Sequence, residues 1–220
     1  YGEIHLLGLW LPRHSAPLDA ELARLRGHRE ERNLKILDRL RSIGINIGYQ
    51  EVLDEAGGES VGRPHIARVL QKRGIVSNFV QAFELYLGYY GAAYVPRTLL
   101  TPEEGVSLMA DLGAVVSFAH PMLIRCPPSW FDEIIPRLKE AGLGAIEAYH
   151  SEHSARDERF CVELAARYGL GLSGGSDYHG MAKPGVELGR GKGGLRVTVA
   201  LLDALKARRK RPVDDAPEVL

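Results

Sequence analysis

The spacing of hydrophobic residues changes in character near residue 100. Before that point, apolar positions recur at helical spacing from Leu18 to Ile43, and no strand is expected between Pro12 and Pro96. Shorter helices are expected at 49–55, 64–73 and 79–87, followed by a loop rich in glycine and tyrosine at 88–97. Beyond it, short apolar runs predict strands at 114–119, 145–149 and 170–173, and helices from 102 and over 130–141, 154–168 and 199–209. This alternation predicts a parallel sheet or barrel.

An additional strand is predicted at the start of the chain, over Glu3–Leu11, where Pro12 and Pro17 end it. The helical stretch then separates this strand from the later ones, so we expect an α/β protein with a helical insertion. The expected parts are a barrel strand at 1–15, the insertion at 16–100, the rest of the barrel at 101–210 and a flexible tail at 211–220.

Composition narrows the class of protein. Hydrophobic residues make up 45% of the 220 residues, and 28 basic residues balance 28 acidic ones, which argues against a broad nucleic-acid-binding surface. Neutrality still allows a few arginines to hold a small anionic substrate. Cys126 and Cys161 lie far apart, and the apolar runs are too short to cross a membrane. We therefore expect a cytoplasmic protein with no membrane contact and no stable protein partner.

The first residues have an unusual pattern for the start of a natural domain. The chain opens without methionine, and Glu3–Leu11 already has the character of a buried strand. We therefore expect the sequence to be a fragment of a longer protein.

Histidines recur where the predicted strands end. His120 follows one strand, His150 ends the next with His153 just beyond, and the third runs into Gly174-Gly175-Ser176-Asp177-Tyr178-His179, while the first strand carries His5. Parallel sheets and barrels place their sites at the carboxyl ends of strands. One such histidine is usually structural, but successive strand ends with an Asp-x-His pair favour a metal such as Zn²⁺, Mn²⁺ or Fe²⁺.

Several segments together resemble one family. Ala119-His120-Pro121 followed by Gly175-Ser176-Asp177-Tyr178-His179 resembles the late motifs of the polymerase-and-histidinol-phosphatase (PHP) phosphoesterases, and Glu3–Gly8 resembles their strand with a metal-binding histidine. Gly62–Arg68, Tyr94–Pro96 and Glu187–Arg190 resemble the bacterial branch of 5′-3′ exoribonucleases and phosphatases of AMP and nucleoside 3′,5′-bisphosphates. The family's opening His-x-His, Asp, His and Glu motifs are not found in this sequence.

The resemblance implies a distorted (β/α)₇ barrel, here without its N-terminal strands, and a site with two or three divalent metal ions, Mn²⁺ before Zn²⁺ or Fe²⁺. Carried over by position, the implied metal ligands are His5, His120, Asp177 and His179. The residues implied near the substrate phosphate are Arg63, His65, His150 and His153. Metal-activated water would hydrolyse phosphate esters of nucleotides or RNA 5′ ends, with Arg63 meeting phosphate charge and His153 protonating the leaving oxygen.

Alternatives remain at this stage. A histidinol-phosphatase-like enzyme for a small substrate would use the same metal site, and a truncated module of this kind would be non-catalytic. Arg63 could be a solvent-facing residue at a helix start. The tyrosines of 86–94 could stack on a base, although aromatic residues more often serve packing.

Overall fold

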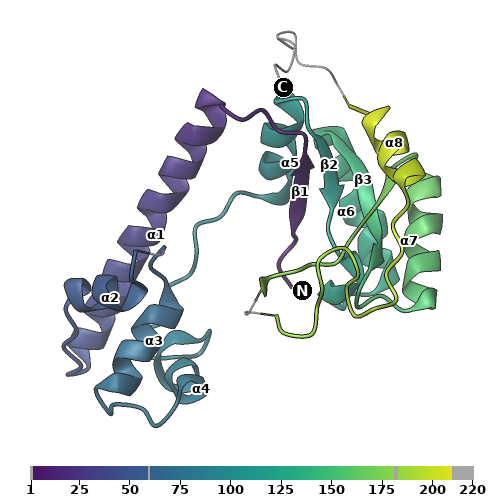
Figure 1. The fold of residues 1–220 in the computed structure, drawn as a ribbon. Helices are drawn as coiled ribbons and strands as arrows, with labels where there is room; N and C mark the ends of the chain where they lie inside the picture. The colour runs from purple at the N-terminus through teal and green to yellow at the C-terminus, as the bar shows by residue number, and fades with distance from the viewer. Residues whose placement is uncertain (1, 59, 181–182, 210–220) are drawn as a thin grey trace. The chain divides into compact units, whose positions relative to one another are not determined.

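The computed structural model describes residues 2–58, 60–180 and 183–209, and the chain divides into two compact units (Figure 1). One unit comprises Tyr1–Ser15 and Leu100–Leu220, and the other comprises Ala16–Leu99. The predicted tail at 211–220 lies outside the described residues. In the described part of the chain, every helix is too short or too polar to span a bilayer.

The first unit contains a four-stranded sheet. Its strands lie in chain order, as β1 (Leu6–Leu9), β2 (Val115–Phe118), β3 (Leu143–His150) and β4 (Gly171–Gly175). The last three are parallel, as the alternating pattern predicts, and the fold is therefore mixed α/β. Within the described residues the sheet is open, with β1 and β4 at its edges.

The direction of β1 departs from the expected parallel arrangement. Leu6 lies opposite Phe118 and Leu9 opposite Val115, so β1 runs antiparallel to β2. The connection between them contains a whole helical unit instead of one crossover helix, and so long a connection does not dictate strand direction. The strand is also shorter than the predicted 3–11.

Helices cover both faces of the sheet. Helices α5 (Pro102–Asp111), α6 (Pro128–Ala141) and α7 (Ala155–Tyr168) share a core with Val116, Phe118 and Ile146. Alternate strand residues point to opposite faces, and Val115 and Ala145 pack instead with Leu205 of α8 (Val199–Lys206). Burial on both sides explains why these strands are apolar without alternation.

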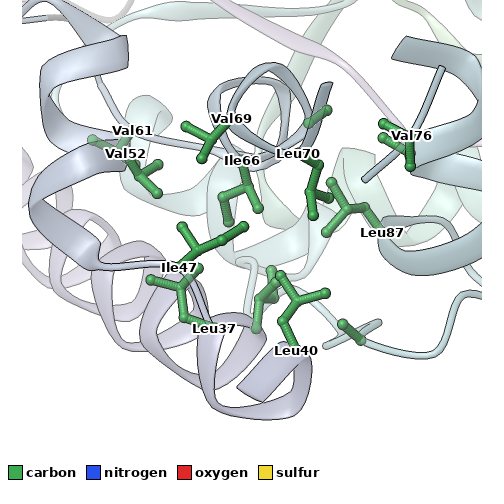
Figure 2. Close-up of a cluster of buried hydrophobic side chains, with 14 of the residues drawn as sticks. Leu37, Leu40, Ile47, Val52, Val61, Ile66, Val69, Leu70, Val76 and Leu87 are labelled. Atoms are coloured by element: carbon green, nitrogen blue, oxygen red, sulfur yellow. The ribbon is translucent and has the colours of Figure 1, made fainter. Parts of the chain in front are cut away.

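The described residues of the second unit form helices joined by loops and contain no strand. Its elements are α1 (Ala16–Ser42), α2 (Tyr49–Ala56), α3 (Arg63–Lys72), α4 (Phe79–Ala82) and a π-helical turn η1 (Phe83–Leu87). Figure 2 shows side chains from these helices meeting in one cluster, including Leu40 of α1 and Ile66 and Leu70 of α3. Each such fully buried side chain contributes about 1.5–3 kcal/mol of transfer free energy.

Candidate metal and phosphate site

The sheet brings histidines from separate strands to one edge. His150 is the last residue of β3, and His120 follows β2 closely, so both lie at the carboxyl ends of parallel strands. His5 precedes β1, and because β1 is antiparallel, its first residues lie at this same edge. The Ala119 N–H donates to the His5 carbonyl at 3.0 Å, which fixes His5 beside His120.

The histidine rings form a continuous row. His5 Nδ1 lies 3.1 Å from His120 Nε2. The ring centroids of His120 and His150 are 5.4 Å apart, and those of His150 and His153 are 5.2 Å apart. His150 Nε2 lies 3.7 Å from Asp177 Oδ2. Six of the eight predicted site residues therefore gather in one unit.

Backbone carbonyls determine where two of the imidazoles carry a proton. His153 Nδ1 lies 2.9 Å from Ala148 O, and His179 Nδ1 lies 2.9 Å from Asp177 O. A carbonyl oxygen only accepts hydrogen bonds, so both Nδ1 atoms are donors. In the neutral ring this leaves Nε2 with its lone pair, which is the usual state of a metal-binding histidine.

Burial keeps the inner histidines neutral. It lowers the pKa of His150 to about 4, with further lowering from the nearby charges of His153 and His120. Burial also lowers the pKa of His120, and the proximity of His5 adds to the effect. Because metal binding requires unprotonated imidazole, these two rings are prepared for it at neutral pH.

The unpartnered histidine nitrogens suit a divalent cation, although they do not form a complete coordination shell among the described residues. His120 Nδ1, His150 Nε2 and His153 Nε2 are buried without a hydrogen-bond partner. Two nitrogens on a tetrahedral zinc ion would lie about 3.3 Å apart, close to the separation between His5 and His120. Among the described residues, however, no three His, Cys, Asp or Glu side chains converge on one point. The predicted ligands instead line one open hollow of about 480 Å³.

Two of the predicted ligands have strained backbones. His120 has φ 30° and ψ 55°, and Asp177 has φ 54°, in the left-handed region that non-glycine residues avoid. Such a conformation costs about 1–3 kcal/mol and is typical of functional sites. The strain aims both side chains at the hollow where the strands end.

Glu147 is a buried acid at this edge that the sequence patterns did not identify. Its side chain is 3% exposed in the middle of β3, and Oε2 accepts the backbone N–H of His120 at 2.7 Å. Burial raises the pKa of Glu147 to about 7. The one available indication was a single carboxylate in an otherwise apolar strand.

The sequence patterns did not identify Lys183 either, because it lies in a loop without periodicity. Its Nζ donates to Asp177 Oδ2 at 2.6 Å and contacts Glu152 Oε1 at 2.8 Å. The ammonium group thus neutralises Asp177 at the position where a metal ion would bind that carboxylate.

Arg63 and His65 belong to the helical unit, at the start of α3. Arg63 Nη1 donates to Leu87 O at 2.9 Å, and its guanidinium lies 5.6 Å from the centroid of the Phe83 ring. His65 is buried, and its Nδ1 accepts the Gly62 N–H at 3.1 Å. Arg63 is therefore held in place and is not a freely solvated helix-start residue.

A cationic hollow of about 370 Å³ surrounds Arg63 within this unit. None of the described residues that line it is acidic, and its basic lining consists of His28, Arg29, Arg32, Arg63, His65 and Arg97. Burial lowers the pKa of Arg32, and the charges of Arg63 and Arg97 lower it further. Guanidinium groups that repel one another around a cavity favour an anion between them.

Curated relatives of this chain act on phosphate esters. A 5′-3′ exoribonuclease of Escherichia coli is 30% identical, with 86% of this chain and 64% of the relative aligned. A 3′,5′-nucleoside bisphosphate phosphatase of Chromobacterium violaceum is 27% identical, with 96% and 74% aligned. The chain thus spans 64% of the length of the exoribonuclease. No family model matches the chain.

Solved structures share the fold. One from Bifidobacterium adolescentis, named as a metal-dependent phosphoesterase, has a TM-score of 0.70 and 26% identity, and covers 94% of this chain and 72% of its own. An amidohydrolase from Chromobacterium violaceum, with bound sulfate and no metal, has a TM-score of 0.68 and 27% identity over 96% and 74%. The resemblance predicted from the motifs is therefore confirmed.

Proposed function

We propose that this chain is a metal-dependent phosphoesterase that hydrolyses phosphate esters of nucleotides or RNA 5′ ends. Its motifs resemble those of the PHP phosphoesterases, and its relatives act on phosphate esters. The observation that carries the proposal is the row of imidazoles beside Asp177 at the carboxyl edge of the sheet. Such a row has no evident structural purpose, since three of its buried nitrogens have no hydrogen-bond partner.

The residues proposed to hold divalent cations are His5, His120, Asp177 and His179. Their mix of imidazole and carboxylate suits Mn²⁺, Zn²⁺ or Fe²⁺, and we propose two or three ions with Mn²⁺ preferred. When bound, such cations stabilise phosphate charge and lower the pKa of a water nucleophile. The strained backbones of His120 and Asp177 hold two of the ligands in position before any ion arrives.

His153 is proposed to move the proton that the leaving oxygen requires. The Ala148 carbonyl holds its Nδ1–H, so that Nε2 is the atom that exchanges a proton with a ligand. His150 is proposed to contact the substrate phosphate from the unit with the sheet. Arg63 and His65 are proposed to bind phosphate within the helical unit. The acid-free cationic hollow around Arg63 supports an anionic substrate.

The finer architecture and location are also proposals. The open sheet is proposed to be part of a distorted (β/α)₇ barrel, because β1 and β4 each have an unpaired edge among the described strands and a barrel closes such edges. A cytoplasmic location is proposed because Cys126 and Cys161 are both free thiols.

The test combines metal content with turnover on this chain as purified. Elemental analysis would be followed by hydrolysis of bis-(p-nitrophenyl) phosphate, AMP, a 3′,5′-bisphosphate and a 5′-phosphorylated RNA oligomer with added Mn²⁺. We expect bound metal and hydrolysis of at least one nucleotide substrate, and loss of both in Asp177→Asn.

Equal turnover by wild type and Asp177→Asn would refute the assignment of the site. Hydrolysis of histidinol phosphate without any nucleotide would replace the proposed substrate class. Absence of both metal and turnover would mean that this chain alone holds an incomplete site. The same assay on a longer chain would then distinguish a truncated enzyme from a non-catalytic module. Glu140→Gln, an exposed change on α6, serves as the control.

A further inference from the structure

The helical unit presents two tyrosines to solvent on a rigid turn. Tyr89 is 71% exposed and Tyr90 is 94% exposed, so neither serves the packing role that aromatic residues usually have. Their rings are 4.9 Å apart at 89°, and the Tyr89 ring lies 5.3 Å from that of Tyr94. An exposed aromatic pair of this kind needs an explanation other than core formation.

The turn itself is tightly built. Gly91 N–H donates to Gly88 O at 2.9 Å, and Ala92 and Ala93 donate back to Leu85 and Tyr86, each at 2.9 Å. A Cβ on Gly91 would lie 2.4 Å from the Tyr86 carbonyl carbon, so only glycine allows this close approach. The tyrosines are therefore displayed on a fixed scaffold, which lowers the entropy cost of binding.

Three arginines donate hydrogen bonds to backbone carbonyls beside this turn, and two of them line the cationic hollow. Arg63 donates to Leu87 O at 2.9 Å, Arg32 donates to Val95 O at 2.8 Å, and Arg39 donates to Tyr94 O. Arg32 and Arg63 also line the hollow. The segment that carries the exposed tyrosines is therefore hydrogen-bonded at Leu87 and Val95 to two arginines of the hollow.

We propose that this part of the helical unit binds single-stranded nucleic acid, with phosphates in the arginine-lined hollow and bases stacked on Tyr89 and Tyr90. A cationic groove beside aromatic rings is how proteins bind single strands without sequence preference, because every base has a π-face. The proposal deepens the proposed function, on which it rests, since it selects a strand over a free nucleotide as the ligand.

The experiment measures binding to the full chain by fluorescence anisotropy, in EDTA so that no turnover occurs. One probe is a 3′-labelled, 5′-phosphorylated octauridylate, and the other is labelled inorganic polyphosphate of similar charge, which has no bases. We expect Tyr89→Ala/Tyr90→Ala to weaken octauridylate binding about tenfold or more and to leave polyphosphate binding unchanged.

Three further variants complete the design. Tyr89→Phe/Tyr90→Phe keeps the rings and should bind octauridylate within about twofold of wild type. Arg29→Met, in the hollow, should weaken both probes. Val80→Ala, a 62% exposed apolar residue outside the turn, should change neither.

An equal effect of the double alanine variant on both probes, or no effect on either, would overturn the proposal. So would a change in oligomeric state on sedimentation without a change in octauridylate binding, which would make the tyrosines a self-association surface. Tyrosine-dependent binding of octauridylate without hydrolysis of any phosphate ester would support this binding site and contradict the proposed function. Hydrolysis of AMP without octauridylate binding would do the reverse.

Discussion

Burial shifts the pKa values of Glu147 and His150 in opposite directions, so the two residues change the stability of the fold with pH in opposite senses. The pKa of Glu147 is raised to about 7, so its contribution to stability is full below its unfolded pKa of 4.5 and is lost as pH rises through 7. The pKa of His150 is lowered to about 4, so its contribution is full above 6.5 and is lost as pH falls through 4. Each shift corresponds to about 3 kcal/mol.

In the metal-free chain these two effects should nearly cancel between pH 4.5 and 6.5. Glu147→Gln removes the carboxyl titration and leaves that of His150. The free energy of unfolding should then rise with pH by about 1 kcal/mol per pH unit in this range. His150→Gln should give the opposite slope. Urea unfolding in EDTA at several pH values measures both, and parallel curves for the two variants would contradict the assignment.

Glu147 also holds the strained His120 backbone through its hydrogen bond to the His120 N–H. A Cβ at Gly175 would lie 2.8 Å from Glu147 Oε1, so Gly175→Ala should push the carboxyl group away. We expect Glu147→Leu and Gly175→Ala to lower Mn²⁺ affinity about 10- to 100-fold, as for other residues that orient metal ligands. Isothermal titration calorimetry measures this change.

Two controls separate positioning from general damage. Glu147→Gln keeps an acceptor and should retain most of the affinity. Adding Gly175→Ala to Glu147→Ala should cost nothing more, because the crowded carboxyl is gone. Additive losses in that double variant would show that Gly175 acts by another route.

At the scale of elements, a capping box begins α5. Thr101 Oγ1 accepts the Glu104 N–H at 3.2 Å, and Glu104 Oε2 accepts the Thr101 N–H at 2.7 Å, which is the reciprocal pattern of a capping box. Thr101→Ala should therefore lower the free energy of unfolding by about 1 kcal/mol, while Thr101→Ser keeps the hydroxyl and most of the stability. Chemical denaturation distinguishes them, and identical midpoints would mean that the cap is not formed in solution.

Other features of the elements depend on distant contacts and were not predictable from local patterns. The direction of β1 is set by pairing with β2, more than a hundred residues away in sequence. Periodicity gave α1 and the three parallel strands, because burial of a repeating face is a local pattern. Glu147 and Lys183 were missed because their partners, the His120 N–H and Asp177, are close only in the folded chain.

At the scale of the whole molecule, the two units divide the proposed chemistry. The unit with the sheet carries the imidazole row, and the helical unit carries an arginine-lined hollow and an exposed tyrosine pair. Each feature is formed by residues of a single unit. The chain can therefore be tested one unit at a time by point substitution while it remains intact.

Metal binding provides the molecular-scale prediction. A cation that binds only the folded chain stabilises it by about 2.7 kcal/mol at a hundred times Kd, so Mn²⁺ should raise Tm and EDTA should reverse the rise. His120→Ala and Asp177→Asn should abolish it. Lys183→Met should keep or enlarge it, because the cation no longer displaces an ammonium group 2.6 Å from Asp177 Oδ2. Calorimetry measures each shift, and an undiminished rise in Tm for Asp177→Asn would place the metal elsewhere, whether or not the chain hydrolyses a phosphate ester.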